Sequence, residues 1–285
     1  MGSREPVPPE PERQAVKHDA EAPGSATFRV PAADYDRFMG RYSQTLAQSF
    51  GDFCLPDRGR FLDVGCGPGA LTAVAVQRLG EAAVSAIDPA PQFVEACRAR
   101  HPGVDVRRAS AEALPFEPDS FAGAAAQLVF HFIAEPSIAL AQMRTVVEPG
   151  GTVAAAVWDA IDGMQMLDAF WDAAAELGHG DPRPDSRGLR LGRPDELASV
   201  WRSGGLDAVT ETTITVTADY SGFDELWDSI LTGTGPAGAF AVSLDGATRD
   251  RLRELLLRRL GRPEGAFELS AVARAVRGVV AEKTP

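Results

Sequence analysis

The sequence predicts an α/β fold, a Rossmann-like doubly wound sheet that is mostly parallel, because short apolar runs alternate with helical stretches along the chain. Alternation of this kind implies crossover connections, with helices covering both faces of the sheet. The 285 residues suffice for one large domain with a full core, and 45% of them are hydrophobic. The expected strands lie near residues 60–64, 83–87, 104–107, 122–127 and 151–158.

The chain begins with a segment that we expect to be disordered. Residues 1–26 are rich in Pro, Glu and Arg and contain almost no apolar residues. The folded domain is therefore expected over residues 27–285. It opens with a helix that starts near Ala33 and continues to about Phe50.

The most informative stretch runs from Phe61 to Thr72, where an apolar run enters a loop with glycine at every second position and then a helix. Such a strand, turn and helix N-terminus is a common binding site for nucleotide-like ligands. Glycine allows the sharp bend and leaves no side chain between backbone and ligand. The loop residues expected at the cofactor are Gly65, Cys66, Gly67 and Gly69.

Two acidic residues indicate which cofactor this is. Asp88 ends the next apolar run, where a carboxylate can accept hydrogen bonds from both ribose hydroxyls. Asp63, two residues before the first loop glycine, would repel a pyrophosphate but suits an ammonium group. Pro68 removes one N–H that a phosphate would use. The two acids favour S-adenosylmethionine over NAD.

Residues 61–72 resemble the first motif of class I S-adenosylmethionine-dependent methyltransferases, and the later motifs of that family follow in order. The branch that the chain resembles is the small-molecule one, related to the methyltransferases of quinone biosynthesis. The resemblance implies a seven-stranded sheet, with further strands near Val209–Thr217 and Phe267–Val279, the last antiparallel. The later motifs are Ala86–Pro89, Ser110–Phe116, Phe121–Phe132 and Glu148–Thr152.

The resemblance also implies which residues hold the cofactor. Asp63 would orient the methionine ammonium and Asp88 the ribose, and Arg41 would meet the methionine carboxylate. Ser110 stands where this branch often has Asp, which weakens the expected contact with the adenine amino group. The remaining implied cofactor residues are Pro89, Ala111, Glu112, Gln127 and Tyr42.

Two long segments between the last strands exceed what the minimal fold requires. Residues 159–206 and 218–266 are expected to form a helical cap together with residues 27–50, because long insertions in such folds often build a lid or a substrate wall. Met164 and Trp227 are the cap residues that we expect to line an apolar acceptor pocket. Other aromatic residues of the cap are expected to pack it onto the sheet.

His131 follows the fourth expected strand and is the candidate catalytic residue. An imidazole there could take a proton from the acceptor near neutral pH. The alternative is a structural hydrogen bond, because methyl transfer often needs no base. Both interpretations stay open at this point.

Charge and composition exclude several classes of partner. The net charge of −12 argues against nucleic acid. The three cysteines lack zinc-binding spacing, and Asp159 and Asp162 lack further ligands, so no metal is expected. No apolar run reaches 18 residues, so no membrane association is expected. A cytoplasmic monomer or homodimer is the expected form.

The sequence therefore predicts an enzyme that transfers a methyl group from S-adenosylmethionine to a small organic acceptor by in-line displacement. Two alternatives remain. One is a protein that binds the cofactor without catalysis, as a sensor or assembly partner. The other is an NAD-dependent oxidoreductase, which would share the glycine loop.

Overall fold

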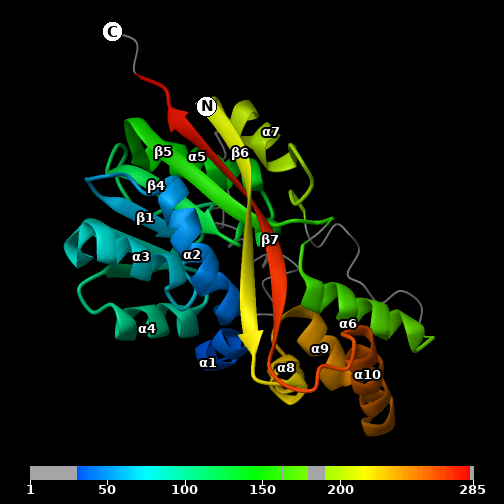
Figure 1. The fold of residues 1–285 in the computed structure, drawn as a ribbon. Coiled ribbons are helices and arrows are strands. Elements are labelled where there is room, and N and C mark those ends of the chain that lie inside the picture. The colour runs from blue at the N-terminus through cyan, green and yellow to red at the C-terminus, as the bar shows by residue number, and fades with distance from the viewer. Residues whose placement is uncertain (1–30, 162, 179–189, 283–285) are drawn as a thin grey trace, which may run out of the picture.

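A computed structural model describes residues 31–161, 163–178 and 190–282. Its centre is a seven-stranded sheet with the order β3-β2-β1-β4-β5-β7-β6 (Figure 1). Neighbouring strands from β3 to β5 run parallel, whereas β7 pairs antiparallel with both β5 and β6. The strands are β1 (Phe61–Val64), β2 (Val84–Asp88), β3 (Asp105–Arg108), β4 (Phe121–Gln127), β5 (Val147–Trp158), β6 (Leu206–Tyr220) and β7 (Phe267–Val280).

This topology confirms the predicted fold class, including the antiparallel last strand. The chain winds outward from β1 to β3 and then returns to place β4 on the other side of β1. Ligands of open α/β sheets bind at such a switch point, beyond the carboxyl ends of the strands. The topology therefore predicts a ligand site among the residues that follow β1, β2 and β4.

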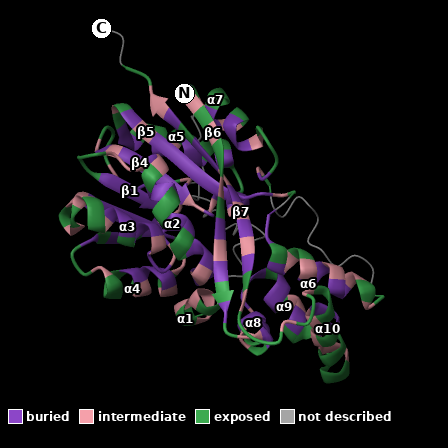
Figure 2. Ribbon diagram, in the orientation of Figure 1, coloured by how far each residue is buried: buried purple, intermediate pink, exposed green. Residues whose placement is uncertain are grey.

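Helices cover the two faces of the sheet and create two apolar cores. Helices α2, α3 and α4 contribute to one core, and α5 and α7 contribute to the other. Successive residues of a strand point to opposite faces of the sheet and so into different cores. In β5, Ala154 and Ala156 belong to the first core, whereas Val153 and Val157 belong to the second. Figure 2 shows the central strands buried. The bounds are α2 (Arg41–Cys54), α3 (Ala70–Leu79), α4 (Pro91–Arg100), α5 (Pro136–Val146) and α7 (Glu196–Ser203).

The N-terminal helix is not regular. A short α1 (Ala32–Tyr35) passes through a π-helical turn, Asp36–Gly40, directly into α2. A π turn holds an extra residue, and each extra residue rotates the following helix face by about 100°. The side chains after Gly40 therefore face other directions than a uniform helical period predicts.

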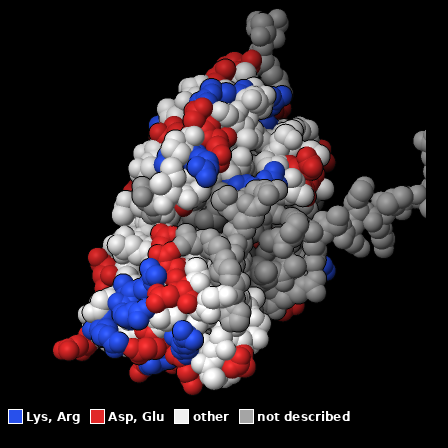
Figure 3. Space-filling view, turned by 90° about the vertical axis from the view of Figure 1, so that its right-hand side faces the viewer, with Lys and Arg blue, Asp and Glu red and all other residues white. Residues whose placement is uncertain are grey.

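A second group of helices lies beyond the lower ends of β6 and β7 in Figure 1. Ion pairs from the last of these helices join the group, with Arg253 bound to Asp224 and Arg259 to Asp172 and Glu176. Figure 3 shows basic and acidic side chains interleaved on this part of the surface. The helices are α6 (Gln165–Glu176), α8 (Phe223–Ile230), α9 (Gly235–Ser243) and α10 (Gly246–Arg259).

Not all of the segment that we expected in the cap lies there. Helix α7, within the expected segment 159–206, packs instead against α5, β6 and β7. Trp201 anchors it, with its indole N–H donating to the Val153 carbonyl at 2.8 Å. The expected tail, residues 1–26, lies outside the described residues, so the domain boundary stays a prediction.

Candidate active site

The loop after β1 bends back so that its backbone meets the end of β2. The N–H groups of Gly65 and Cys66 both donate to the Ile87 carbonyl, each at 2.8 Å. Gly65 has φ +74°, and a Cβ there would lie 2.5 Å from a methyl of Val129. Glycine is therefore required at this position for both conformation and space.

A cavity of about 420 Å³ opens beside this loop, at the carboxyl edge of the sheet. Six of the predicted cofactor residues line it: Asp63, Gly65, Cys66, Gly67, Gly69 and Gln127. Residues of the N-terminal helix and of α3 form the other walls. The predicted loop site and this cavity therefore coincide.

Asp63 is the most unusual residue of the cavity wall. It is 1% exposed, and its Oδ2 accepts a hydrogen bond from the Thr72 hydroxyl at 2.6 Å. Burial raises the pKa of the carboxyl to about 7, although the Thr72 hydrogen bond opposes the rise. Among the described residues, no donor reaches the buried Oδ1 atom. A buried acceptor without a partner is costly unless a ligand supplies the donor.

Gln127 presents a second acceptor of this kind from the end of β4. Its Nε2 donates to the Ser43 carbonyl at 2.9 Å, which holds the amide in place. Its Oε1 is buried, and no donor within the described part of the chain reaches it. Two acceptors in one cavity fit a cationic group with several N–H donors, such as an ammonium. The wall therefore fits the amino-acid end of the cofactor that the sequence predicts.

Asp88 is adjacent to the loop but does not line the cavity. Its Oδ2 accepts from the Gly67 N–H at 2.9 Å, and its Oδ1 accepts from the Ala90 N–H at 2.8 Å. Burial raises its pKa to about 6, while these two backbone hydrogen bonds lower it. Asp88 therefore shapes the glycine loop, a role in addition to the predicted one.

The predicted adenine segment also lies outside the cavity and is hydrogen-bonded within itself. The Glu112 N–H donates to Ser110 Oγ at 3.2 Å, and Glu112 Oε1 accepts from the Glu135 N–H at 3.0 Å. Ala111 is buried in the second core. The Pro89 carbonyl accepts from Arg108 Nε at 3.1 Å.

Arg41 and Tyr42, which were expected at the cofactor, do not line the cavity. The Arg41 guanidinium pairs with Glu225 at 2.9 Å, lies over the Tyr220 ring and is not part of the cavity. Tyr42 is fully buried, with the Tyr220 hydroxyl donating to its oxygen at 3.2 Å. The π turn before α2 is the physical reason, because it rotates these residues away and brings Ser43 to the cavity.

Both ring nitrogens of His131, the candidate general base, are engaged in hydrogen bonds. The Trp158 N–H donates to its Nε2 at 2.7 Å, so the proton resides on Nδ1, which donates to the Arg190 carbonyl at 2.8 Å. Burial lowers its pKa to about 4. Both nitrogens are thus engaged and the side chain is 5% exposed, which favours the structural alternative that the sequence left open.

Met164 and Trp227, the predicted acceptor-pocket residues, do not line the cavity. Met164 is 3% exposed and Trp227 is 6% exposed, and both belong to the first core. The cap is filled at these positions by its own side chains. Their role at the acceptor therefore stays a prediction, with neither side chain at the cavity in the conformation that the structure describes.

Sequence reasoning missed several residues of the cavity wall. Tyr35 lies there, and its pKa is raised by burial and by the charge of Asp88. Arg100 joins two walls, because it donates to the Pro68 carbonyl at 2.9 Å and pairs with Asp36. Arg100 ends α4, and its sequence neighbourhood contains no recognisable motif. The other missed residues that are polar are Asp36, Ser43, Gln44, Gln48 and His101.

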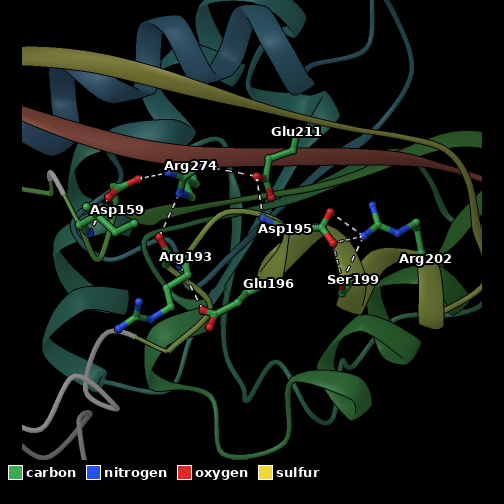
Figure 4. Close-up of polar contacts among 10 residues, drawn as sticks. Asp159, Arg193, Asp195, Glu196, Ser199, Arg202, Glu211 and Arg274 are labelled. Carbon is green, nitrogen blue, oxygen red and sulfur yellow. Dashed lines mark hydrogen bonds and ion pairs between the residues drawn. The ribbon is translucent and has the colours of Figure 1, made fainter.

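Asp159, at the end of β5, is bound in a separate network. Its Oδ2 pairs with Arg274 at 2.5 Å, and its Oδ1 accepts from the Ile161 N–H at 2.6 Å (Figure 4). Arg274 also donates to the Gly192 carbonyl and lies 3.6 Å from Glu211. Asp162 lies outside the described residues. Asp159 is therefore paired with a cation, and the network joins the end of β5 to β7 and to the segment at Gly192.

Within the described ranges, no group of three or more metal-binding side chains is found. Within the same ranges, each helix is too short or too polar to span a bilayer.

Comparisons with known proteins agree with this geometry. A family model described as a methyltransferase domain matches residues 62–155. A ubiquinone biosynthesis O-methyltransferase of Methylocella silvestris is 32% identical over 196 residues, which cover 67% of this chain and 69% of that enzyme. A trans-aconitate 2-methyltransferase of Methylobacterium nodulans is 31% identical over 134 residues, 46% of this chain and 50% of that enzyme.

A solved structure shares the fold at low identity. It is a phosphoethanolamine N-methyltransferase 2 of Haemonchus contortus in complex with S-adenosylhomocysteine, with a TM-score of 0.54 and 15% identity. The match covers 88% of this chain and 57% of that chain. These matches support neither the oxidoreductase nor the non-catalytic protein that the sequence left open.

Proposed function

This chain belongs to the S-adenosylmethionine-dependent methyltransferases, and on that premise we propose that the cavity beside Asp63 binds the amino-acid end of the cofactor. The supporting observation is the pair of buried acceptors, Asp63 Oδ1 and Gln127 Oε1, in one cavity wall. An ammonium supplies the donors that both lack. It would also compensate the charge that burial disfavours on Asp63.

The other cofactor contacts follow from the neighbouring elements. Asp88 would accept from the ribose hydroxyls, because a carboxylate keeps free lone pairs after accepting two N–H bonds. The segment Ser110–Glu112 would face the adenine, with the backbone N–H of Ala111 as donor. Arg100, in place of Arg41, is the cation at the cavity that suits a carboxylate.

The chain contributes orientation to the reaction. When bound, the cofactor supplies an electrophilic methyl group on sulfur. Asp63 and the glycine loop hold the reacting end in a fixed position, and orientation of two reactants contributes about 7–11 kcal/mol to lowering a barrier. No proton transfer is assigned to His131, since both of its nitrogens are engaged.

We propose that the methyl acceptor is a small organic molecule. The support is that the relatives are named a ubiquinone biosynthesis O-methyltransferase and a trans-aconitate 2-methyltransferase. A cytoplasmic location and a monomeric or homodimeric state remain predictions from the sequence.

Calorimetric titration tests the cofactor assignment directly. We expect S-adenosylmethionine and S-adenosylhomocysteine to bind with micromolar affinity and NADH not to bind. Binding of NADH alone would contradict the assignment, as would the absence of binding by the first two. With the cofactor established, transfer of a labelled methyl group to quinone precursors and to unsaturated carboxylic acids would identify the acceptor class.

A further inference from the structure

Thr72 lies behind the cavity wall, between the lining residues Leu71 and Ala73 in the chain. It is fully buried and occupies the first turn of α3, where backbone N–H groups lack partners within the helix. Its hydroxyl donates to Asp63 Oδ2 at 2.6 Å, and its backbone N–H also favours the charged form of Asp63. One residue of α3 thus engages the carboxylate on the side away from the orphaned Oδ1.

The Thr72 hydroxyl also accepts a contact from a neighbouring helix. The Cys97 thiol, from α4, donates to Thr72 Oγ1 at a distance of 3.8 Å. Because that contact uses an acceptor position of the hydroxyl, its proton is left for Asp63. A chain of three groups from α4, α3 and β1 therefore ends at the carboxylate.

We propose that Thr72 is a positioning residue for the cofactor, holding the Asp63 carboxylate so that Oδ1 faces the cavity. This inference rests on the proposed binding of the cofactor's ammonium at Asp63. A carboxylate with one oxygen anchored by a hydrogen bond cannot rotate freely, so the second acceptor keeps its position before the ligand arrives. Such preorganisation lowers the cost of binding.

Thr72 has a strong influence on the ionisation of Asp63, because the other surroundings of that carboxyl disfavour its charge. Burial and the negative charge of Asp88, from β2, both disfavour ionisation of Asp63. The other titratable groups that interact with it are thiols: Cys54 from α2, Cys66 from the loop and Cys97 from α4. Two hydrogen bonds from Thr72, one from its hydroxyl and one from its backbone, lower the pKa of Asp63. Removing its hydroxyl should therefore raise that pKa further.

The test compares Thr72→Val, which removes the hydroxyl at nearly constant shape, with Thr72→Ser, which keeps it. Thr45→Val is the matched control, because Thr45 is an exposed helical threonine whose hydroxyl bonds only within its own helix, to the Arg41 carbonyl. Binding of S-adenosylhomocysteine is measured by calorimetry from pH 6 to 9. The second ligand is 5′-methylthioadenosine, which shares the nucleoside but lacks the amino-acid end.

We expect Thr72→Val to weaken S-adenosylhomocysteine binding about tenfold at pH 7, the effect of one hydrogen bond to a charged group. The loss should shrink toward pH 9, where the carboxylate ionises without help. Thr72→Ser and Thr45→Val should bind like the wild type. The affinity for 5′-methylthioadenosine should stay unchanged in all variants.

Two outcomes would overturn the inference while leaving the cofactor assignment intact. One is that Thr72→Val binds S-adenosylhomocysteine like the wild type at every pH. The other is an equal loss for both ligands, independent of pH, which would mean that Thr72 only supports the loop. If the wild type itself fails to bind S-adenosylhomocysteine, the proposed function is overturned and this inference with it.

Discussion

Asp63 and Asp159 are two buried carboxylates at the same edge of the sheet, one in β1 and one after β5, and their surroundings differ. Both are nearly inaccessible, with exposures of 1% and 2%. Asp159 has an arginine partner, Arg274, at 2.5 Å. Asp63 lines a cavity and has a hydroxyl partner for one oxygen, while its second oxygen is buried with no donor among the described residues.

The difference separates a structural carboxylate from a ligand-binding one. A buried charge is tolerated when a cation and hydrogen bonds compensate it, and Asp159 meets that condition. Asp63 carries the desolvation cost without a cation, which is the reason for its raised pKa. An uncompensated carboxylate beside a cavity is typical of a site that a ligand completes.

The largest effect is expected on stability, when Arg274, the cation that compensates the buried charge of Asp159, is removed. Arg274→Met should lower the free energy of unfolding by about 3–5 kcal/mol, because it leaves Asp159 as an unpaired buried charge. Urea unfolding measures this loss. Arg202→Met, which removes an exposed pair with Asp195 in the same network, should have only a small effect (Figure 4).

The double variant Arg274→Met with Asp159→Asn sharpens this point. It should recover much of the lost stability, because the charge disappears with its partner. If it is as unstable as the single variant, lost packing of the arginine, rather than the unpaired charge, is the cause.

The next effect concerns binding at the other carboxylate. Asp63→Asn should weaken S-adenosylhomocysteine binding about 100-fold, because the neutral amide loses the charge-assisted contact with the ammonium. Calorimetry measures the affinity, and thermal unfolding checks that the variant is folded. An unchanged affinity would remove Asp63 from the site.

The raised pKa of Asp63 predicts that, without ligand, the free energy of unfolding of the wild type depends on pH more strongly than that of Asp63→Asn. The pKa of Asp63 is raised to about 7 in the folded protein, so its protonated form favours the fold, and that contribution is lost as the pH rises toward 7. Relative to Asp63→Asn, the wild type should therefore lose about 2 kcal/mol between pH 5 and 7. Unfolding of both proteins in urea at each pH measures the difference, and a difference that stays constant with pH would argue against the raised pKa.

The smallest effect is expected at His131, which lies between the two regions. His131→Asn should cost about 1 kcal/mol of stability through one lost hydrogen bond. Methyl transfer should keep its pH profile once an acceptor is known. Loss of the fall in activity at low pH, with the fold intact, would show instead that His131 acts as a base.

The positions of the strands along the chain, the glycine loop and the residues Asp63, Gly65 and Gln127 could be recognised in the sequence. Strand periodicity and the glycine pattern are local signals, and the loop follows β1 directly, so short-range rules place these residues. Side-chain positions were predicted least well where the interaction partners are distant in the sequence. Arg41 binds Glu225 and the Asp219 carbonyl, 184 and 178 residues away.

By itself, then, the sequence determined the fold class and the cofactor family, because both depend on backbone geometry encoded over a few residues. The tertiary structure alone decided which side chains reach the cavity. A single π turn redirected the N-terminal helix, and packing used both nitrogens of His131. The physical reason is that the charge and hydrogen-bonding state of a buried group depend on all elements packed around it, which no local pattern records.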